Sequence, residues 1–266
     1  MLNGPEGHRR ALAREQERFA RLLTAAGERG ALGARVPGCP AWSVGDLAAH
    51  LTAVHRWAAA STRRSPAGPL PPERGGPGAT DAGAADPGAA DPAAAYAAAA
   101  AELRRALAVP PATPCRTLHG RGVVADWSRR QLHETLVHRW DLQDALGPPG
   151  TADPADTDPV DVEAVDVEAG DAEAVAADCV AEVVEALLPR QVRLGRVPAP
   201  AAGVLLLAPR RRWVLGEPRR VVAEVAGPAQ VLARLLWRRT GPDDPRLRVT
   251  GDRAAAAALL GAALTP

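Results

Sequence analysis

The stretch Ser128–Leu146, SRRQLHETLVHRWDLQDAL, places a carboxylate and an imidazole four residues apart, at Glu134 and His138. Ser128 followed by Gln131 has the pattern of a capping box, so we expect a helix to begin there. On a helix, side chains at positions i and i+4 lie on one face, about 5–6 Å apart at Cβ. This pair can therefore share a metal ion if a third ligand comes from elsewhere in the chain.

A second stretch, VPGCPAWSVGDLAAHLTAVHRW at Val36–Trp57, supplies that third ligand. Ser43, with Asp46 three residues later, predicts the start of a helix that carries His50. Asp46 lies one turn before His50, where its carboxylate can hydrogen-bond the ring nitrogen that faces away from a metal. Asp141, three residues after His138, is placed for the same role there.

The candidate metal ligands are thus His50, Glu134 and His138, with Asp46 and Asp141 as their outer partners. Two imidazoles and a carboxylate suit zinc or iron(II) better than magnesium or calcium. A competing interpretation pairs Glu134 with Arg130 or Arg139 on a solvated face and makes His50 a core histidine.

Two further histidines fall near the candidate ligands along the chain but point elsewhere on their helices. His55 is about 140° around its helix from His50, so the two are poor partners for one ion. His133 is about 100° from Glu134, and we expect it at the rim of the site. Trp42 and Trp127, beside helix starts, are candidates to line a cavity.

The composition of the 266 residues limits the chemistry and the partners. All 32 basic residues are arginine, so Schiff-base and P-loop lysine chemistry are excluded. A formal net charge of +1 gives no general reason to expect nucleic acid or an anionic membrane as partner. Hydrophobic residues make up 47% and aromatic residues only 3%, which favours closely packed helices rich in Ala, Leu and Val.

The cysteines Cys39, Cys115 and Cys179 are odd in number and form no CxxC spacing. This argues against a disulfide framework and a thiolate zinc site, and none of the three has motif support as a nucleophile. The first residues lack the apolar core of a signal peptide, and no run approaches the roughly 20 apolar residues of a membrane span. We therefore expect a cytoplasmic protein.

The hydrophobic pattern predicts an α plus α+β protein. Residues 1–190 are expected to form a helical bundle of four principal helices, interrupted by low-complexity segments near 65–92 and 148–171, the second strongly acidic. Residues 200–266 are expected to form a smaller α+β domain. The expected helices are 7–29, 43–57, 92–107, 128–146, 172–188, 228–237 and 252–264, and the expected strands are 203–208, 213–216, 220–226 and 246–250.

Three stretches resemble one family. VPGCPAWSVGDLAAHLTAVHRW and HETLVHRWDLQDA are similar to the two ligand motifs of mycothiol-dependent maleylpyruvate isomerase-like proteins, and VAGPAQVLARLLWRRTGPDDPRLRVTGD is similar to their C-terminal domain. The resemblance implies a DinB-like four-helix bundle that binds a divalent metal, usually zinc. Its His, Glu and His ligands correspond to His50, Glu134 and His138.

The resemblance also implies a function, which is mycothiol-dependent cis–trans isomerisation. A metal-activated thiolate would add reversibly to a small unsaturated acid such as maleylpyruvate, and elimination after bond rotation would return the trans isomer and the thiol. The segments near 65–92 and 153–171 are longer or more biased than the family pattern. The substrate-binding arginine has no motif here, which leaves Arg74, Arg129 and Arg139 as candidates.

Two alternatives stay open. A zinc-dependent thiol S-transferase would use the same thiolate on an electrophile and consume the thiol. A non-catalytic metal-binding or regulatory module would keep the bundle, and its arginine-rich C-terminal region would contact an acidic partner or nucleic acid. The expected partners are a small thiol and a small unsaturated acid or electrophile, without nucleic acid or membrane, and the sequence does not indicate an oligomeric state.

Overall fold

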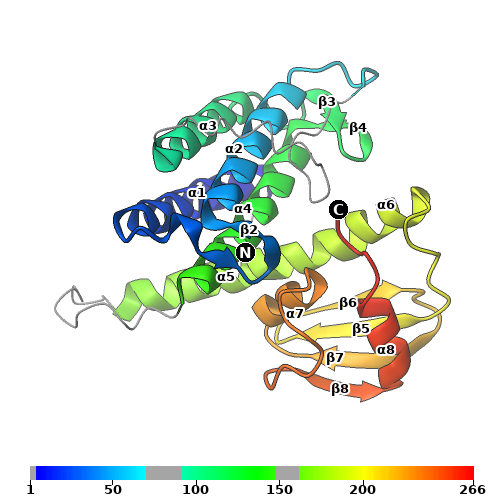
Figure 1. Cartoon of the computed structure of the whole chain (residues 1–266). Coiled ribbons are helices and arrows are strands. Elements are labelled where there is room, and N and C mark those ends of the chain that lie inside the picture. Colours follow the sequence, from blue (N-terminus) through cyan, green and yellow to red (C-terminus); the bar gives the residue numbers. More distant parts are fainter. Residues whose placement is uncertain (1–3, 70–90, 148–161) are drawn as a thin grey trace. The chain divides into compact units, whose positions relative to one another are not determined.

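The computed structural model describes residues 4–69, 91–147 and 162–266. Contacts divide the chain into two compact units, a helical one from Asn3 to Pro154 and a mixed one that begins at Ala155 and ends at Pro266 (Figure 1). The expected fold class, helical first and α+β second, is confirmed.

The helical unit has its secondary structure in the order helix, hairpin, helix, helix, hairpin, helix. Its described elements are α1 (Gly4–Glu28), η1 (Ala31–Gly33), β1 (Arg35–Val36), β2 (Cys39–Ser43), α2 (Val44–Ser61), α3 (Pro92–Leu107), β3 (Pro114–Thr117), β4 (Gly120–Val123) and α4 (Val124–Leu146).

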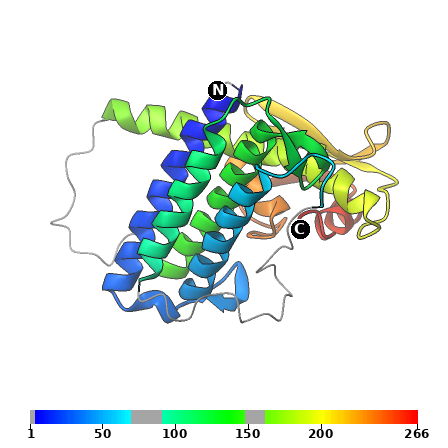
Figure 2. The same cartoon turned by 90° about the horizontal axis from the view of Figure 1, so that it is seen from above.

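Helices α1 to α4 lie side by side, and their apolar faces form the core of this unit (Figure 2). Helix α1 packs against α3 and α4, and α2 packs against the same two helices. The core is built mainly from Leu and Ala, and Phe19 of α1 contacts Tyr96 of α3 with ring centroids 4.6 Å apart. Small alanine side chains on α3 allow this close packing, and Asp91 caps α3 by accepting from the amides of Ala93 and Ala94.

Helix α4 begins at Val124, so the predicted start at Ser128 is wrong. The carboxylate of Asp126 accepts a hydrogen bond from the amide of Val123 at 2.8 Å, which fixes the first turn. Gly122 permits this arrangement, because a Cβ there would lie 2.5 Å from Oδ2 of Asp126. Ser128 instead lies inside the helix and is buried.

A short antiparallel hairpin leads into each of two helices, and neither hairpin was expected from the sequence. Strands β1 and β2 pair ahead of α2, and β3 and β4 pair ahead of α4. These strands have two to five residues, too few for a periodic pattern to be recognised. Helices α2 and α4 thus start in the same way, with a hairpin followed by an aspartate that caps the first turn.

The second unit contains a four-stranded sheet and helices. Its described elements are α5 (Val162–Glu182), the π-helical turn η3 (Val183–Leu187), α6 (Leu188–Arg193), β5 (Gly203–Ala208), β6 (Arg211–Gly216), β7 (Val221–Ala226), α7 (Ala229–Leu236), β8 (Arg248–Gly251) and α8 (Arg253–Leu260). The strand order is β6-β5-β7-β8, with β5 and β7 parallel and the outer pairings antiparallel. The four strands and helices α7 and α8 agree with the expected ones to within a few residues.

Helix α5 belongs with this second unit by contacts, whereas the sequence-based division into 1–190 and 200–266 assigned it to the first. It packs against α7, and its Glu173 accepts a hydrogen bond from the amide of Ala229 at 2.9 Å, at the start of α7. The helix also starts at Val162, ten residues earlier than the expected 172, inside the segment expected as an acidic insertion. Residues 148–161 of that segment, and 70–90 of the other low-complexity segment, lie outside the described residues.

Across the described residues, the helices are too short or too polar to traverse a lipid bilayer.

Candidate metal centre

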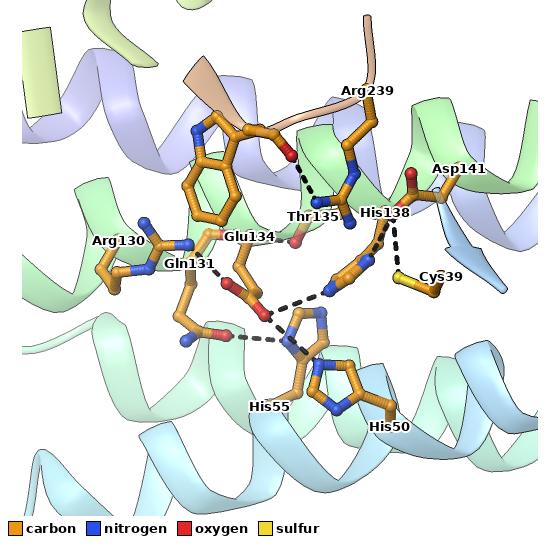
Figure 3. A network of polar contacts seen from close by, with 11 residues as sticks. Cys39, His50, His55, Arg130, Gln131, Glu134, Thr135, His138, Asp141 and Arg239 are labelled. Atoms are coloured by element: carbon orange, nitrogen blue, oxygen red, sulfur yellow. Dashed lines mark hydrogen bonds and ion pairs between the residues drawn. The ribbon is translucent and has the colours of Figure 1, made fainter. Parts of the chain in front are cut away.

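Helix α4 carries Glu134 and His138 one turn apart on one face (Figure 3). Oε1 of Glu134 lies 3.3 Å from Nε2 of His138. The imidazole is buried and the Glu134 side chain is 17% exposed, so the pair lies at a partly open edge of the core. The sequence predicted this local geometry correctly although it misplaced the helix start.

Helix α2 brings His50 to the same carboxylate oxygen. Ser43 and Asp46 form the predicted capping box, which fixes where α2 begins and therefore where His50 lies along it. Nε2 of His50 is 3.3 Å from Oε1 of Glu134, the same separation as for His138. The ligand atoms of His50, Glu134 and His138 all lie within 4.8 Å of one another, and we call this group the HEH cluster.

Asp141 hydrogen-bonds the ring nitrogen of His138 that does not face Glu134. Its Oδ2 lies 2.9 Å from Nδ1 of His138, and the Asp141 carboxylate is fully buried. An imidazole that donates Nδ1–H to a carboxylate keeps a lone pair on Nε2, the nitrogen that faces Glu134. The ring is therefore oriented as a metal ligand requires.

Asp46 does not take the corresponding position beside His50. Its Oδ2 accepts from the amide of Ser43 at 2.9 Å and from the Ser43 hydroxyl at 2.7 Å. These bonds lower the pKa of Asp46. The carboxylate expected as an outer partner of His50 thus caps the helix start, where the first amides have no partner within the helix.

Arg130 contacts the second oxygen of Glu134, Oε2, and both side chains are largely buried. The rival interpretation of the sequence, an ion pair of Glu134 with Arg130, is therefore present alongside the HEH cluster. Burial by itself raises the pKa of Glu134, but Arg130 and the bonds to His138 and His50 reverse this, and the pKa lies well below its ordinary value. Glu134 is thus an anion with one oxygen held by Arg130 and the other facing two imidazoles.

The pKa of His138 is set by opposing effects. Burial lowers it, whereas the hydrogen bonds with Asp141 and Glu134 raise it, and the result is a pKa of about 8. Without a metal, the ring is thus largely protonated near neutral pH, and a metal ion must displace that proton.

Trp42 packs beside both imidazoles, with ring centroids 4.7 Å from His50 and 6.0 Å from His138, and its expected role of lining a cavity stays a prediction. Trp127 does not share this role. It is buried, donates its indole N–H to the Arg116 carbonyl and meets the Trp57 ring edge-on, so it is a core residue.

His55 and His133 are both fully buried, so the expectation of His133 at the rim is wrong. His55 lies in a chain of hydrogen-bonded polar side chains that was not expected from the sequence. Its Nδ1 is 3.0 Å from Oε1 of Gln131, its Nε2 is 3.2 Å from Nε2 of Gln16, and Arg104 donates to Gln16 at 2.9 Å. Each of the helices α1 to α4 contributes one of these four side chains. Glutamines inside helices carry no pattern from which such a chain could be predicted.

Of the three arginine candidates for substrate binding, one has a clear structural role. Arg139 is buried, contacts Glu15 of α1 at 2.5 Å and donates to Gln143, so its guanidinium ties α4 to α1. Arg129 lies on α4, and Arg74 is outside the described residues.

The donor set of the HEH cluster fits a divalent ion of the zinc type. Two imidazole nitrogens converge on one carboxylate oxygen, and the ring orientation of His138 is fixed by a buried aspartate. Zinc sites with three protein ligands of this kind keep a fourth position open for a water or a substrate.

These features define a class of two-domain proteins that has a three-residue metal-binding cluster in a helical domain, followed by a small α+β domain. Residues 12–143 match the family model described as mycothiol maleylpyruvate isomerase N-terminal domain, and residues 174–258 match the MDMPI C-terminal domain. The chain belongs to the mycothiol-dependent maleylpyruvate isomerase family.

Solved structures agree with this assignment at the level of the fold. The chain is similar to the crystal structure of the mycothiol-dependent maleylpyruvate isomerase, with a TM-score of 0.58, 14% identity and 93% of each chain covered. It is also similar to a histidine-to-alanine mutant of that enzyme, with a TM-score of 0.63, 14% identity and the same 93% coverage of each chain. No curated protein sequence matches the chain.

Proposed function

We propose that this protein is a mycothiol-dependent, zinc-dependent cis–trans isomerase of the maleylpyruvate isomerase type. The observation that carries the proposal is the convergence of two imidazole nitrogens on one oxygen of Glu134, in a chain of this family. His50, Glu134 and His138 would hold the ion. Bound there, zinc would supply an open coordination position and lower the pKa of a thiol that occupies it.

The chain's own residues have defined tasks in this proposal. Asp141 orients the His138 ring through Nδ1, so that Nε2 faces Glu134 and can bind the ion once its proton is displaced, and Arg130 holds Glu134 so that it presents a single oxygen. Trp42 covers one side of both imidazoles with an apolar ring. A thiolate of the cosubstrate would add to the double bond of the unsaturated acid, the resulting single bond would rotate, and elimination would return the trans acid and the thiol.

The carboxylates around the cluster favour a thiol over water as the activated group. Hydrolysis at a metal normally needs a general base beside the ion. Glu134 faces the imidazoles, Asp141 is bonded to His138, and Asp46 caps α2, so each of these three carboxylates already has a task. A thiol that loses its proton on binding needs no such base.

The test combines metal analysis with turnover. Purified protein loaded with zinc should bind about one ion per chain and should isomerise maleylpyruvate only when mycothiol is added. Glu134→Ala and His138→Ala should lose the ion and the activity together. Turnover without thiol, or unchanged thiol-dependent turnover in Glu134→Ala, would refute the proposal.

The same assay separates the S-transferase alternative. An isomerase regenerates its thiol, so product should greatly exceed the mycothiol supplied. Consumption of one thiol per product, with a stable conjugate, would instead identify a transferase.

A further inference from the structure

Cys39 of β2 contacts Asp141, the residue that hydrogen-bonds His138 of the HEH cluster (Figure 3). Its Sγ is 3.9 Å from Oδ2 of Asp141, the same oxygen that lies 2.9 Å from Nδ1 of His138. The ligand atoms of Cys39, His138 and Asp141 all lie within 4.8 Å of one another. This second group, which we call the CHD cluster, has the donor types of a metal site and uses the opposite nitrogen of the same imidazole.

We propose that the CHD cluster is a second metal site, selective for thiophilic ions, that competes with the HEH cluster for His138. This inference is independent of the reaction that the protein catalyses. The site itself requires only the positions of Cys39, Asp141 and His138, whereas the competition also rests on the proposed binding of zinc by the HEH cluster.

The separations suit a metal ion. Ligands bind a zinc-like ion at about 2.0–2.3 Å, so two donors on one ion lie no more than about 4.6 Å apart. The Sγ to Oδ2 and Nδ1 to Oδ2 separations of 3.9 Å and 2.9 Å satisfy this limit. A sulfur ligand favours soft ions, whereas the HEH cluster, which has only nitrogen and oxygen donors, lacks that preference.

Cys39 is the most exposed donor of the CHD cluster. It is half-buried, whereas Asp141 is fully buried. Binding converts the Cys39 thiol to a thiolate and releases its proton to solvent. The other two cysteines, Cys115 and Cys179, are fully buried, and burial raises the pKa of Cys115 to about 11.

Competition follows from the chemistry of imidazole. A neutral ring has one lone pair, so its two nitrogens cannot both bind metal while one carries a proton. When Nε2 of His138 binds an ion in the HEH cluster, Nδ1 keeps its proton and donates a hydrogen bond to Asp141. An ion in the CHD cluster needs that same Nδ1 and occupies Asp141. Each ion therefore weakens the binding of the other by the same factor.

The first experiment uses cadmium as the thiophilic probe on the full-length, metal-free protein. Cadmium bound by a thiolate produces a sulfur-to-metal charge-transfer absorption in the ultraviolet. This band should saturate at one equivalent in the wild type and in Cys115→Ala, and it should be absent in Cys39→Ser. Circular dichroism and thermal unfolding establish that Cys39→Ser is folded, and zinc binding by Cys39→Ser establishes that its HEH cluster is intact.

The second experiment measures competition. Saturating zinc should raise the cadmium concentration needed for the band by about tenfold or more, the range of a strong coupling between sites. In Glu134→Gln, which weakens the HEH cluster, zinc should have much less effect on the band.

Each outcome decides part of the proposal. A missing band in the wild type, or a band that persists in Cys39→Ser, would overturn the site itself. A band that zinc does not affect, in protein whose HEH cluster is shown to bind zinc, would overturn the sharing of His138. Absence of isomerase activity would leave both readouts intact. An HEH cluster that binds no zinc would remove the competition but not the cadmium band, so the two proposals fail separately.

Discussion

Nδ1 of His138 and Oδ2 of Asp141 lie 2.9 Å apart on successive turns of α4, and this contact points Nε2 of His138 at Glu134. A single helix therefore carries two of the three candidate ligands and the group that orients one of them. Only His50 has to be brought in from another element, so the relative position of α2 and α4 decides whether the HEH cluster is complete.

Asp141→Asn should weaken zinc binding by about 10–100-fold, the usual effect of losing an outer carboxylate. The matched control is Asp46→Ala, because Asp46 bonds Ser43 and not a ligand. This variant should bind zinc nearly as the wild type does but lose about 0.5–2 kcal/mol of stability with the helix cap. Calorimetric zinc titration and thermal unfolding distinguish the two effects, and an equal loss of affinity in both variants would contradict the assignment.

Zinc affinity should rise with pH through about 8, because the pKa of His138 in the metal-free protein is about 8. Below this value the protonated ring must release its proton, so the apparent affinity should fall roughly tenfold per pH unit. Above it the ring is neutral and the dependence should flatten. Competition with a chromophoric chelator across the pH range measures the curve. A flat profile below neutral pH would show that His138 does not exchange a proton for the metal.

His55 should make the protein sensitive to mild acid. Burial lowers the pKa of this histidine to about 4, although its hydrogen bond to Gln131 opposes the shift. The unfolded chain binds a proton near 6.5, so this contribution to stability is complete above about pH 6.5 and is lost as the pH falls toward 4.

Replacement of His55 tests this prediction. The loss of unfolding free energy between about pH 7 and about pH 5 should be smaller in His55→Gln by about 2 kcal/mol, since glutamine does not titrate. His55→Leu should be less stable at every pH, by about 1–3 kcal/mol for each buried amide left without a partner. Urea unfolding measures both quantities. An equal pH dependence in wild type and His55→Gln would contradict the prediction.

A fragment that ends at Pro154 should bind zinc with the stoichiometry of the whole chain, because the HEH cluster lies entirely within residues 3–154. The complementary fragment, which begins at Ala155, should bind no zinc with an affinity comparable to that of the whole chain. A fragment ending near Pro189 should bind zinc but be less soluble, because it retains α5 without α7, its contact partner. Metal analysis after gel filtration compares the three fragments. Zinc binding by the C-terminal fragment alone would contradict this layout.

The sequence predicted the features that depend on local spacing. Glu134 and His138 on one helical face, and the cap of α2 at Ser43, follow from neighbours within four residues. Other features depend on contacts between distant segments. Cys39 beside Asp141 joins residues 102 positions apart, and the partner of α5 is a helix more than 40 residues later. Spacing alone allowed Asp46 both the helix cap and a contact with the His50 ring, and its printed hydrogen bonds go to Ser43 at the cap.

The two hairpins ahead of α2 and α4 bear on how this chain tolerates change in length. Each ligand-bearing helix is anchored at its own start, by Ser43 with Asp46 in one case and by Asp126 in the other. The low-complexity stretches follow α2 and α4, so neither lies between an anchor and the ligands of its helix. Insertions and deletions there leave the count from anchor to ligand unaltered, so such stretches can diverge freely between relatives while the three ligands keep their register.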